Sequence, residues 1–418
     1  MAKKLIQNSA KLLSANVFAQ AIGLAVYPLL ARLYTPENFG VLNLFLSIGG
    51  ILILLSTLDY QQAIVLPKHE KQAIAVVHLC LTITLVVCGV VIVSIPIAGA
   101  IAELFKTPTL EKWYFLLPLY ILVMAGWNIL SYWYIRRAEY NRNSGYQVLQ
   151  SSLGAGMKIG LGCGGYLQGG MIVSVVVAPL LALLTSCMLA WEKHIRPLLC
   201  LNRNEVREVA TTYRKFPIYS FPSSILNTLS SQLPTLLLTP IFGNVEIGLW
   251  SMAVLLGFAP LSMISKSLNQ TLYQHTMDLL HQGQNIIPTY RKFSMVAIGI
   301  IVPCFAILWW ILPQLTTLLL GQDWEQTGHI LRWMLPWLAA NFLTASTGFL
   351  AGIYFKQHIE LLFEILLIVL RIGAIVIGIH TSDFETFTIL YSMVSFTVAA
   401  AHYFWLMILI MRSSTASQ

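Results

Sequence analysis

The sequence has few charged residues. Asp, Glu, Lys and Arg make up 10% of its 418 residues, whereas a soluble domain contains about 25%. The mean hydropathy is +0.73, so there are too few polar side chains to cover the surface of a soluble globule of this length. We therefore expect an all-α integral membrane protein that has the lipid bilayer as its main solvent.

The sequence also lacks the motifs of metal sites, disulfide frameworks and soluble catalytic sites. The six cysteines form no Cys-x-x-Cys pair and mostly fall within apolar stretches, which is typical of packing residues. The nine histidines show no metal-ligand spacing. There is no catalytic triad, no phosphate-binding loop and no carboxylate pair of the enzymatic kind. We therefore predict no cofactor, no metal and no enzymatic activity.

Long apolar stretches are abundant. A helix that spans a membrane needs about 20 apolar residues. Such stretches lie near residues 9–31, 41–66, 73–101, 114–135, 145–166, 170–191, 217–241, 247–273, 293–319, 329–353, 359–379 and 386–410. We predict twelve transmembrane helices. Eleven or thirteen are the alternative counts.

Lys and Arg favour every second gap between these spans. When successive gaps are assigned to alternate sides of the membrane, eighteen cations fall on one side. They are Lys3, Lys4, Lys11, Lys68, Lys71, Arg136, Arg137, Arg142, Lys193, Arg196, Arg203, Arg207, Arg214, Lys215, Arg291, Lys292, Lys356 and Arg412. Four fall on the other side: Arg32, Lys106, Lys112 and Arg332. Because cytoplasmic loops carry the excess of Lys and Arg, we expect both termini and the longest loop, residues 192–216, to be cytoplasmic.

The net charge of +8 does not by itself indicate nucleic-acid binding. The basic residues are spread over several membrane-flanking loops and form no patch interleaved with aromatic residues. The topology rule already explains the charge, so we expect no nucleic-acid partner. Lys3 and Lys4 precede a long first span without a small-residue cleavage site, which favours an uncleaved first helix over a signal peptide.

A short acidic turn followed by a glycine and an apolar helix occurs twice. The copies align Gly40 with Gly248, an offset of 208 residues, almost half of the chain. Six spans separate the copies, so they have the same orientation and an axis along the membrane normal would relate them. We predict two six-helix lobes, residues 1–191 and 217–418, related by this pseudo-two-fold axis and joined by a cytoplasmic basic linker at 192–216.

Polar residues recur at helical spacing on the predicted helices one, seven and eight, so that each set shares one face of its helix. The candidates for a cavity lining are Asn16, Gln20, Ser224, Asn227 and Asn269. On the first helix the stripe continues to Gly23 and Tyr27. Because polar groups that face lipid are costly, these residues either line a cavity, which we favour, or form hydrogen bonds between helices.

Three cations lie inside the predicted spans. Lys158 and Arg371 are near the middle of spans five and eleven, and Lys266 is nearer the cytoplasmic end of span eight. Lys158 points roughly away from a row of three glycines, Gly156, Gly160 and Gly164, along which another helix can pack closely. Ionisable residues inside a membrane are functional candidates, and the alternative for Lys158 and Arg371 is a buried structural ion pair.

Three carboxylates are candidates for ion coupling or ion pairing. Glu360 and Glu364 project within about 40° of Arg371 on a helical wheel. Asp59 lies close to the cytoplasmic end of the second span. Asp59 and Lys266 are near enough to a membrane interface to reach water instead.

Two parts of the chain resemble a known family. Residues 30–40, LARLYTPENFG, are similar to the opening motif ARL-x-TPE-x-FG of Wzx-type polysaccharide flippases, which belong to the multidrug/oligosaccharidyl-lipid/polysaccharide (MOP) exporter superfamily. Residues 216–222, 226–230, 242–243 and 259–264 resemble the start of the second lobe in that family. Relatives often carry a basic residue early in helix eight, where this chain has Ala253 and Val254.

The resemblance implies a MOP-type fold and a flippase that works by alternating access in the bacterial inner membrane. Its cargo would be an undecaprenyl-diphosphate-linked oligosaccharide. Its partners would be membrane lipid and the polysaccharide polymerase with its chain-length machinery. A diphosphate needs cations in a low-dielectric cavity. The candidates are Lys158, Arg371, Lys266 and Arg32.

Two other functions are weighed against this one. A cation-coupled multidrug exporter of the same superfamily would favour carboxylates in its lumen, whereas the charges in the middle of these spans are mostly positive. A membrane polysaccharide ligase or polymerase would need a large outward loop with catalytic Arg or His. No outward gap here exceeds about a dozen residues by the positive-inside assignment.

Overall fold

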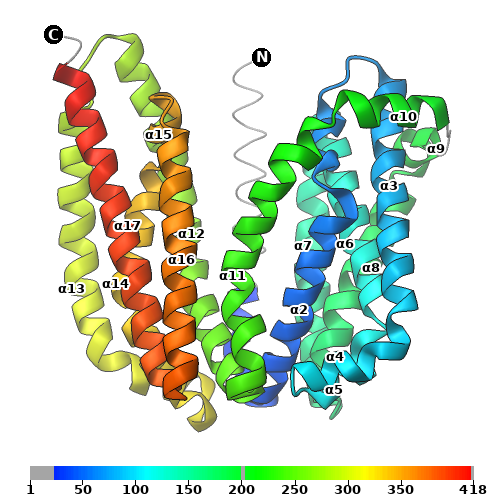
Figure 1. Cartoon of the computed structure of the whole chain (residues 1–418), viewed down its shortest axis with the longest axis horizontal. Helices are drawn as coiled ribbons and strands as arrows, with labels where there is room; N and C mark the ends of the chain where they lie inside the picture. The colour runs from blue at the N-terminus through cyan, green and yellow to red at the C-terminus, as the bar shows by residue number, and fades with distance from the viewer. Residues whose placement is uncertain (1–22, 199–202, 416–418) are drawn as a thin grey trace. The chain divides into compact units, whose positions relative to one another are not determined.

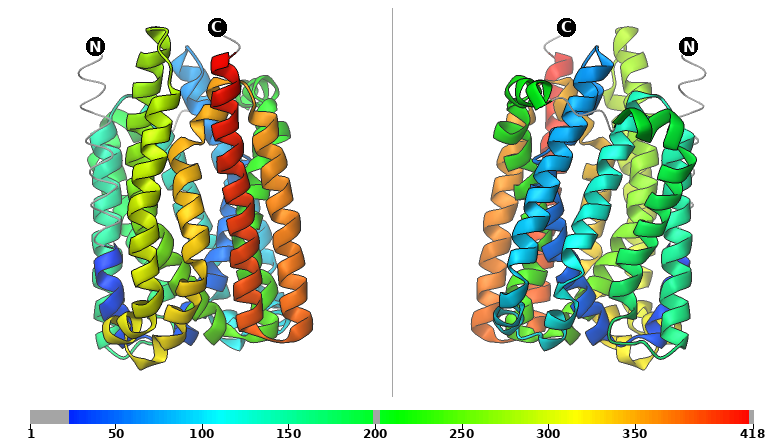
Figure 2. Two further views of the ribbon diagram at one scale, coloured as in Figure 1. Left: turned by 90° about the vertical axis from the view of Figure 1, so that its left-hand side faces the viewer. Right: turned by 90° about the vertical axis from the view of Figure 1, so that its right-hand side faces the viewer.

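A computed structural model describes residues 23–198 and 203–415 of the chain (Figure 1). All the regular elements in these residues are helices. The chain divides into two compact units, residues 1–248 and 249–418. Figure 2 shows long helices running side by side in each unit, for example α13, α14, α17 and α16 in the second.

The first unit begins, in its described part, with the helix Gly23–Leu33. Its other long helices are α2 (Pro36–Thr57), α3 (Glu70–Val93), α6 (Leu117–Arg136), α7 (Tyr140–Cys163), α8 (Gly170–Leu189) and α11 (Phe221–Phe242). The shorter elements between them are η1 (Tyr60–Val65), η2 (Ile95–Ile97), α4 (Ala98–Leu104), α5 (Pro108–Tyr114), η3 (Trp191–Ile195), α9 (Arg196–Leu198), α10 (Arg203–Thr212) and η4 (Phe216–Ser220).

The helix α12 (Asn244–His281) begins in the first unit and continues through the second. The second unit also contains α13 (Ile287–Leu320), η5 (Gln322–Trp324), α14 (Glu325–Thr347), α15 (Phe349–Ile353), α16 (Gln357–Thr381) and α17 (Phe384–Thr415). In this unit α14 packs against α13 and α17, and α17 packs against α16.

The long helices coincide one for one with the twelve predicted spans. Seven of the described helices are long and apolar enough to cross a membrane, and the pair α5 and α6, bent by 60°, makes an eighth. The others are α7, α11 and α14, whose sequences contain more polar residues, and the first helix, which is described only from Gly23. The polar helices α7 and α11 carry Lys158 and the predicted stripe of the seventh span.

Glycine and proline set the ends of several helices. Pro36 is the first residue of α2, where a backbone N–H would have no partner within the helix, so the missing N–H of proline costs nothing. Gly243 and Gly321 end α11 and α13 with φ angles of 93° and 110°, which glycine adopts without strain. These residues fix where the chain turns back into the next helix.

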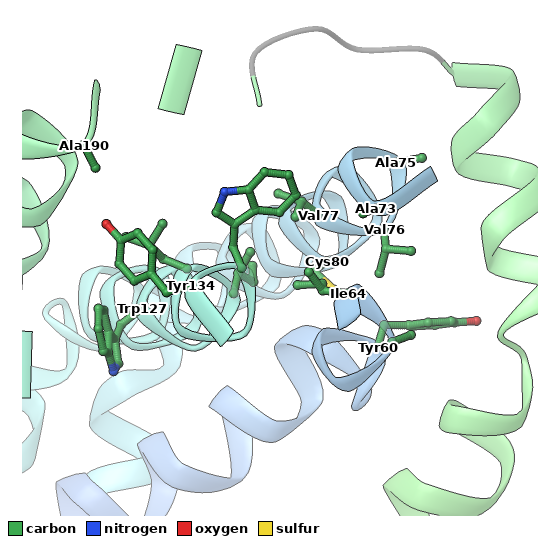
Figure 3. Close-up of a cluster of buried hydrophobic side chains, with 14 of the residues drawn as sticks. Tyr60, Ile64, Ala73, Ala75, Val76, Val77, Cys80, Trp127, Tyr134 and Ala190 are labelled. Carbon is green, nitrogen blue, oxygen red and sulfur yellow. The ribbon is translucent and has the colours of Figure 1, made fainter. Parts of the chain in front are cut away.

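The core of the first unit is a cluster of buried side chains from η1, α3 and α6, with contributions from α7 and α10 (Figure 3). The figure labels, among others, Tyr60, Ile64, Val76, Cys80, Trp127 and Tyr134. The ring of Trp127 on α6 stacks on Tyr146 of α7, with centroids 3.3 Å apart and planes 9° apart. Aromatic packing of this kind fixes the relative position of the two helices.

The segment predicted as a linker packs on the first unit. Val209 of α10 is buried in the core cluster with 2% of its surface exposed. The hydroxyl of Tyr60 donates a hydrogen bond to the backbone oxygen of Ala210 at 3.0 Å. Within that unit α11 contacts α2. The compact units divide at Gly248, and the lobe boundaries expected from the sequence, at 191 and 217, stay a prediction.

The two glycines that carry the sequence repeat lie at one helix crossing. A Cβ atom built on Gly40 would lie 2.6 Å from the carbonyl carbon of Asn244, and one built on Gly248 equally close to that of Pro36. Asn244 follows Pro36 by 208 residues, the same offset that relates Gly248 to Gly40. The starts of α2 and α12 therefore touch backbone to backbone in a symmetric way.

Replacing either glycine should destabilise the protein. We expect Gly40→Ala or Gly248→Ala to lower stability by about 1–3 kcal/mol, because the methyl group meets backbone atoms that cannot rotate away. Thermal unfolding of the purified protein would measure this. Gly89→Ala is the control, since no described atom lies within 4 Å of its Cβ position, and it should be neutral or stabilising by about 0.5–1 kcal/mol. Equal melting temperatures for Gly40→Ala and Gly89→Ala would contradict the close crossing.

Candidate functional site around Lys158

A cavity of about 240 Å³ lies inside the first unit. Its walls come from the helix Gly23–Leu33, α2, α6, α7 and α8. The polar side chains that line it are Tyr27, Tyr120, Gln150, Ser151, Lys158 and Ser174. None of the described residues in the lining is Asp or Glu. The cavity is therefore a chamber whose described lining carries one positive and no negative side chain.

Lys158 provides the charge of this chamber. Its side chain is half-buried, and its ammonium forms no ion pair with a carboxylate in residues 23–198 or 203–415. The backbone oxygen of Lys158 accepts a hydrogen bond from the hydroxyl of Tyr34 at 2.8 Å. Tyr34 is 1% exposed, so this bond holds α7 firmly against the end of the first helix.

The glycines of α7 pack differently from the row that the sequence suggests. No described atom lies within 4 Å of a Cβ built on Gly156 or Gly160, whereas one built on Gly162 would lie 3.0 Å from the ring of Tyr34. Gly154 faces Ala178 of α8 at 3.8 Å. In the described part of the chain, the close approach of neighbouring helices to α7 is therefore made through Gly154 and Gly162.

Tyr120 and Gln150 belong to the lining, although the sequence did not single them out. The ring of Tyr120 is held 5.5 Å from that of Phe45. Gln150 lies two turns before Lys158 on the same face of α7, with Gly154 between them. This i, i+4, i+8 spacing is the signal in the sequence that would have found Gln150, whereas Tyr120 has apolar neighbours on α6 and belongs to no such pattern.

Ser174 lines the chamber, and its hydroxyl hydrogen is already used in a hydrogen bond within its own helix. Its hydroxyl donates to the backbone oxygen of Gly170 at 2.6 Å, within α8. The hydroxyl therefore presents acceptor lone pairs to the chamber rather than a free donor.

The polar stripe of the first helix reaches the chamber. Gly23 and Tyr27, its two described members, both line the cavity. Asn16 and Gln20 precede them at helical spacing but lie outside the described residues. The ring of Tyr27 packs 6.3 Å from that of Phe39.

Arg371 lies in the second unit, in an aromatic cage. Its side chain is 8% exposed. The guanidinium carbon is 5.1 Å from the ring centre of Trp337 and 4.9 Å from that of Tyr391, and Nε donates to the hydroxyl of Ser395 at 3.1 Å. Cation–π contacts that are shielded from water contribute about 2 kcal/mol or more. The aromatic rings and Ser395 thus give the guanidinium partners within its own unit. A role of Arg371 in binding cargo stays a prediction.

The remaining charged candidates of the second unit are more accessible. Lys266 and Glu364 are exposed, and Glu360 is half-buried. Asn269, one turn after Lys266 on α12, donates a hydrogen bond to the backbone oxygen of Ala345 at 2.9 Å. This is a hydrogen bond between two helices, which was the alternative to a cavity lining for the polar stripes.

The remaining candidates of the first unit are Arg32, Asn227, Ser224 and Asp59. Arg32 and Asn227 are exposed. Ser224 donates a hydrogen bond to the carboxylate of Asp59 at 2.5 Å, and Asp59 is 2% exposed. The structure therefore joins two of the predicted residues directly, a lining candidate on α11 and a coupling candidate beyond the end of α2.

Larger cavities in the second unit have a different chemistry. One of about 700 Å³ lies between α13 and α17, and its lining is apolar apart from Tyr290, Arg291 and Ser294. Another, of about 430 Å³, is lined by residues such as Phe305, Trp309 and Phe396. Both lack the concentration of hydrogen-bonding side chains found around Lys158, so size alone does not identify the site.

Comparison with known sequences gives two findings. The family model described as "Polysaccharide biosynthesis protein" matches residues 29–328. The chain is also similar to the succinoglycan biosynthesis transport protein ExoT of Rhizobium meliloti (strain 1021), with 20% identity over 310 residues, or 73% of this chain. The matched region spans 60% of the length of that relative.

Comparison with solved structures gives the fold. An inward-facing multidrug resistance MATE family transporter of the MOP superfamily matches with a TM-score of 0.72, at 15% identity, over 98% of this chain and 99% of the other. A MOP superfamily transporter from Pyrococcus furiosus, whose binding pocket is described as having reverse polarity, matches with a TM-score of 0.59, at 15% identity, over 96% and 95%. These similarities confirm the predicted MOP-type fold.

Arg371 should contribute mainly to stability. We expect Arg371→Gln to lower the stability of the protein by about 2–3 kcal/mol, because the cage loses its cation and Ser395 its charged donor. Thermal unfolding in detergent measures the change. Lys266→Gln replaces an exposed cation and should leave the melting temperature unchanged. An unchanged melting temperature for Arg371→Gln would show that the cage is not stabilising.

Proposed function

Because the chain belongs to the polysaccharide biosynthesis protein family and folds as a multi-pass MOP-type transporter, we propose that it is a flippase for a lipid-linked oligosaccharide. The cargo is an undecaprenyl-diphosphate-linked repeat unit of a surface polysaccharide such as O antigen, and the membrane is the bacterial inner membrane. Its head group crosses by alternating access while its hydrocarbon tail remains in lipid.

The observation that carries this proposal is the ammonium of Lys158 in a chamber whose described lining has no carboxylate. A buried or half-buried charge needs a counter-charge, and none of the described residues supplies one. A diphosphate does so well, since charge-assisted hydrogen bonds to phosphate oxygens are short and strong in a low dielectric. The unpaired cation thus favours an anionic cargo.

The size of the chamber limits which part of the cargo it holds. Its volume of about 240 Å³ is several times that of one water molecule, about 30 Å³, yet below the range of about 300–1,000 Å³ typical of pockets for drug-sized ligands. The chamber therefore accommodates the diphosphate, and the glycan extends beyond it. The phenol of Tyr120 and the amide of Gln150 are suited to the sugar or phosphate oxygens next to the linkage.

The same chamber argues against the drug-exporter alternative. A cationic drug would meet the ammonium of Lys158 and no described carboxylate, and like charges in a low dielectric repel strongly. The solved multidrug transporters share the fold with this chain at 15% identity, which carries no information about cargo. The residues that line the chamber of Lys158 are therefore what favours the flippase over the drug exporter.

The orientation follows from the charge of the loops. Both termini and the segment 192–216 are cytoplasmic under this proposal, since they carry most of the Lys and Arg. The sequence contains no nucleotide-binding motif, so an ion gradient, the membrane potential or the cargo gradient drives transport. A polysaccharide polymerase and its chain-length machinery would receive the flipped unit.

Neutralising Lys158 should reduce transport. We expect Lys158→Gln, introduced into the chromosome of the source bacterium, to lower surface polysaccharide by about 10–100-fold, the effect of losing a charged hydrogen bond of about 1.5–3 kcal/mol. Lys158→Arg keeps the charge and should retain most of the activity. The measurement is polysaccharide per cell at matched amounts of membrane-inserted protein.

Lys68→Gln serves as the control, because Lys68 is an exposed lysine of the first unit, and it should leave the polysaccharide unchanged. Wild-type polysaccharide in Lys158→Gln would contradict the anion-binding role. Normal polysaccharide combined with increased drug sensitivity would favour the exporter.

A further inference from the structure

The larger cavity of the second unit, of about 700 Å³, is a groove between α13 and α17. Both helices pack mainly on α14 and contact each other little, which leaves the groove between them. Met295, Ile298 and Gly299 line it from α13, and Met407 and Met411 line it from α17. Its walls are therefore almost entirely apolar.

The apolar walls of this groove face away from the helix bundle. Met295 has 59% of its surface exposed and Ile298 has 45%. Ala297, between them on the same helix, is buried and packs with Phe342 and Tyr403. In a protein whose helices cross a bilayer, exposed apolar side chains in the middle of a helix lie against the hydrocarbon tails of lipids. The groove is therefore open to the lipid.

One end of the groove is polar, and Arg291 provides its charge. Two other polar side chains of the lining already have partners. The hydroxyl of Tyr290 shares a hydrogen bond with that of Thr276 at 2.6 Å, and Ser294 donates to the backbone oxygen of Tyr290 at 2.7 Å. The guanidinium of Arg291 forms no ion pair with a carboxylate in residues 23–198 or 203–415. The described lining contains no Asp or Glu, so the N–H donors of Arg291 are available to an anion.

Further cations lie at the same end of the groove. Lys292 follows Arg291 and is exposed, and Arg412 lies in the last turn of α17, next to Met411 of the lining. In the orientation proposed above, this end of both helices is cytoplasmic. The cytoplasmic leaflet is the one that carries anionic phospholipids. The positive end of the groove and the head groups of that leaflet are therefore complementary in charge.

We propose that the groove between α13 and α17 binds an anionic phospholipid of the cytoplasmic leaflet. The phosphate lies on Arg291, and one acyl chain follows the groove past Met295 and Ile298 to Gly299. Basic pockets between membrane helices on the cytoplasmic side are typical sites for anionic head groups. A phosphate group also accepts the paired N–H donors of a guanidinium in short, charge-assisted hydrogen bonds.

The length of the groove suits one leaflet. Gly299 follows Arg291 by eight residues, which is about 12 Å along a helix that rises 1.5 Å per residue. One leaflet contributes about half of a hydrocarbon core that is about 30 Å thick. A second apolar cavity, of about 430 Å³, begins at Ile301 and gives the end of the chain room to continue. This inference goes beyond the proposed function and does not depend on it, because the ligand is a constituent of the membrane and not the cargo.

Native mass spectrometry of the purified full-length protein, titrated with phosphatidylglycerol or phosphatidylethanolamine, tests the site. We expect the tightest phosphatidylglycerol site to saturate at about one lipid per chain and to bind phosphatidylethanolamine, which has no net charge, about fivefold more weakly. Arg291→Gln should weaken phosphatidylglycerol binding by about fivefold, or about 1 kcal/mol for one cation. Lys68→Gln is the control, since Lys68 is an exposed lysine of the first unit, and it should bind as the wild type does.

A second variant tests the apolar part of the groove. No described atom lies within 4 Å of a Cβ built on Gly299, so the side chain of Gly299→Leu fits and projects into the groove. It should weaken phosphatidylglycerol binding by about tenfold, or about 1.4 kcal/mol. Gly89→Leu is the matched control, because the Cβ position of Gly89 is equally open and lies in the first unit.

Three results would overturn the proposal. The first is equal binding of the two lipids by the wild type, which would make the groove part of the unselective lipid boundary. The second is wild-type phosphatidylglycerol binding in both Arg291→Gln and Gly299→Leu. The third is a dimer that is present in the wild type and in Gly89→Leu but lost in Gly299→Leu, which would assign the groove to a second copy of the chain.

Discussion

The cost of placing a charge in a low-dielectric interior is the constraint on which the rest of this structure depends. It keeps most of the 25 Lys and Arg residues in the connections between apolar helices. Each ionised group that remains inside therefore needs polar or aromatic partners, or a chamber that a charged ligand can enter. Arg371 lies in an aromatic cage, Lys158 lines a chamber, and Asp59 accepts hydrogen bonds from Ser224 and Gln61.

Arg371 and Lys158 show how the same sequence signal leads to different roles. Both are cations near the middle of predicted spans. Arg371 is enclosed by Trp337, Tyr391 and Ser395 and is 8% exposed. Lys158 is half-buried and faces a chamber of about 240 Å³. A satisfied cation holds a bundle together, whereas an unpaired one in a chamber is available to an anionic ligand.

Much of the site depends on residues with ordinary sequence contexts. Tyr120 contributes a phenol to the chamber from an apolar helix, and no pattern in the sequence marks it. Gln61 donates to the carboxylate of Asp59, next to the left-handed turn at Leu58 and Asp59. The partner of that carboxylate, Ser224, is 165 residues away. Such combinations arise from packing, which local periodicity does not encode.

The sequence by itself determined the membrane environment and the helical spans, because apolar length and charge placement are set by the bilayer. It also singled out Lys158 as a candidate, since a lysine in the middle of a predicted span is conspicuous. The tertiary structure decided what each polar residue does: it caged Arg371, opened a chamber beside Lys158 and brought Ser224 to Asp59. The reason is physical, since the energy of a buried charge depends on the atoms around it, and those come from distant parts of the chain.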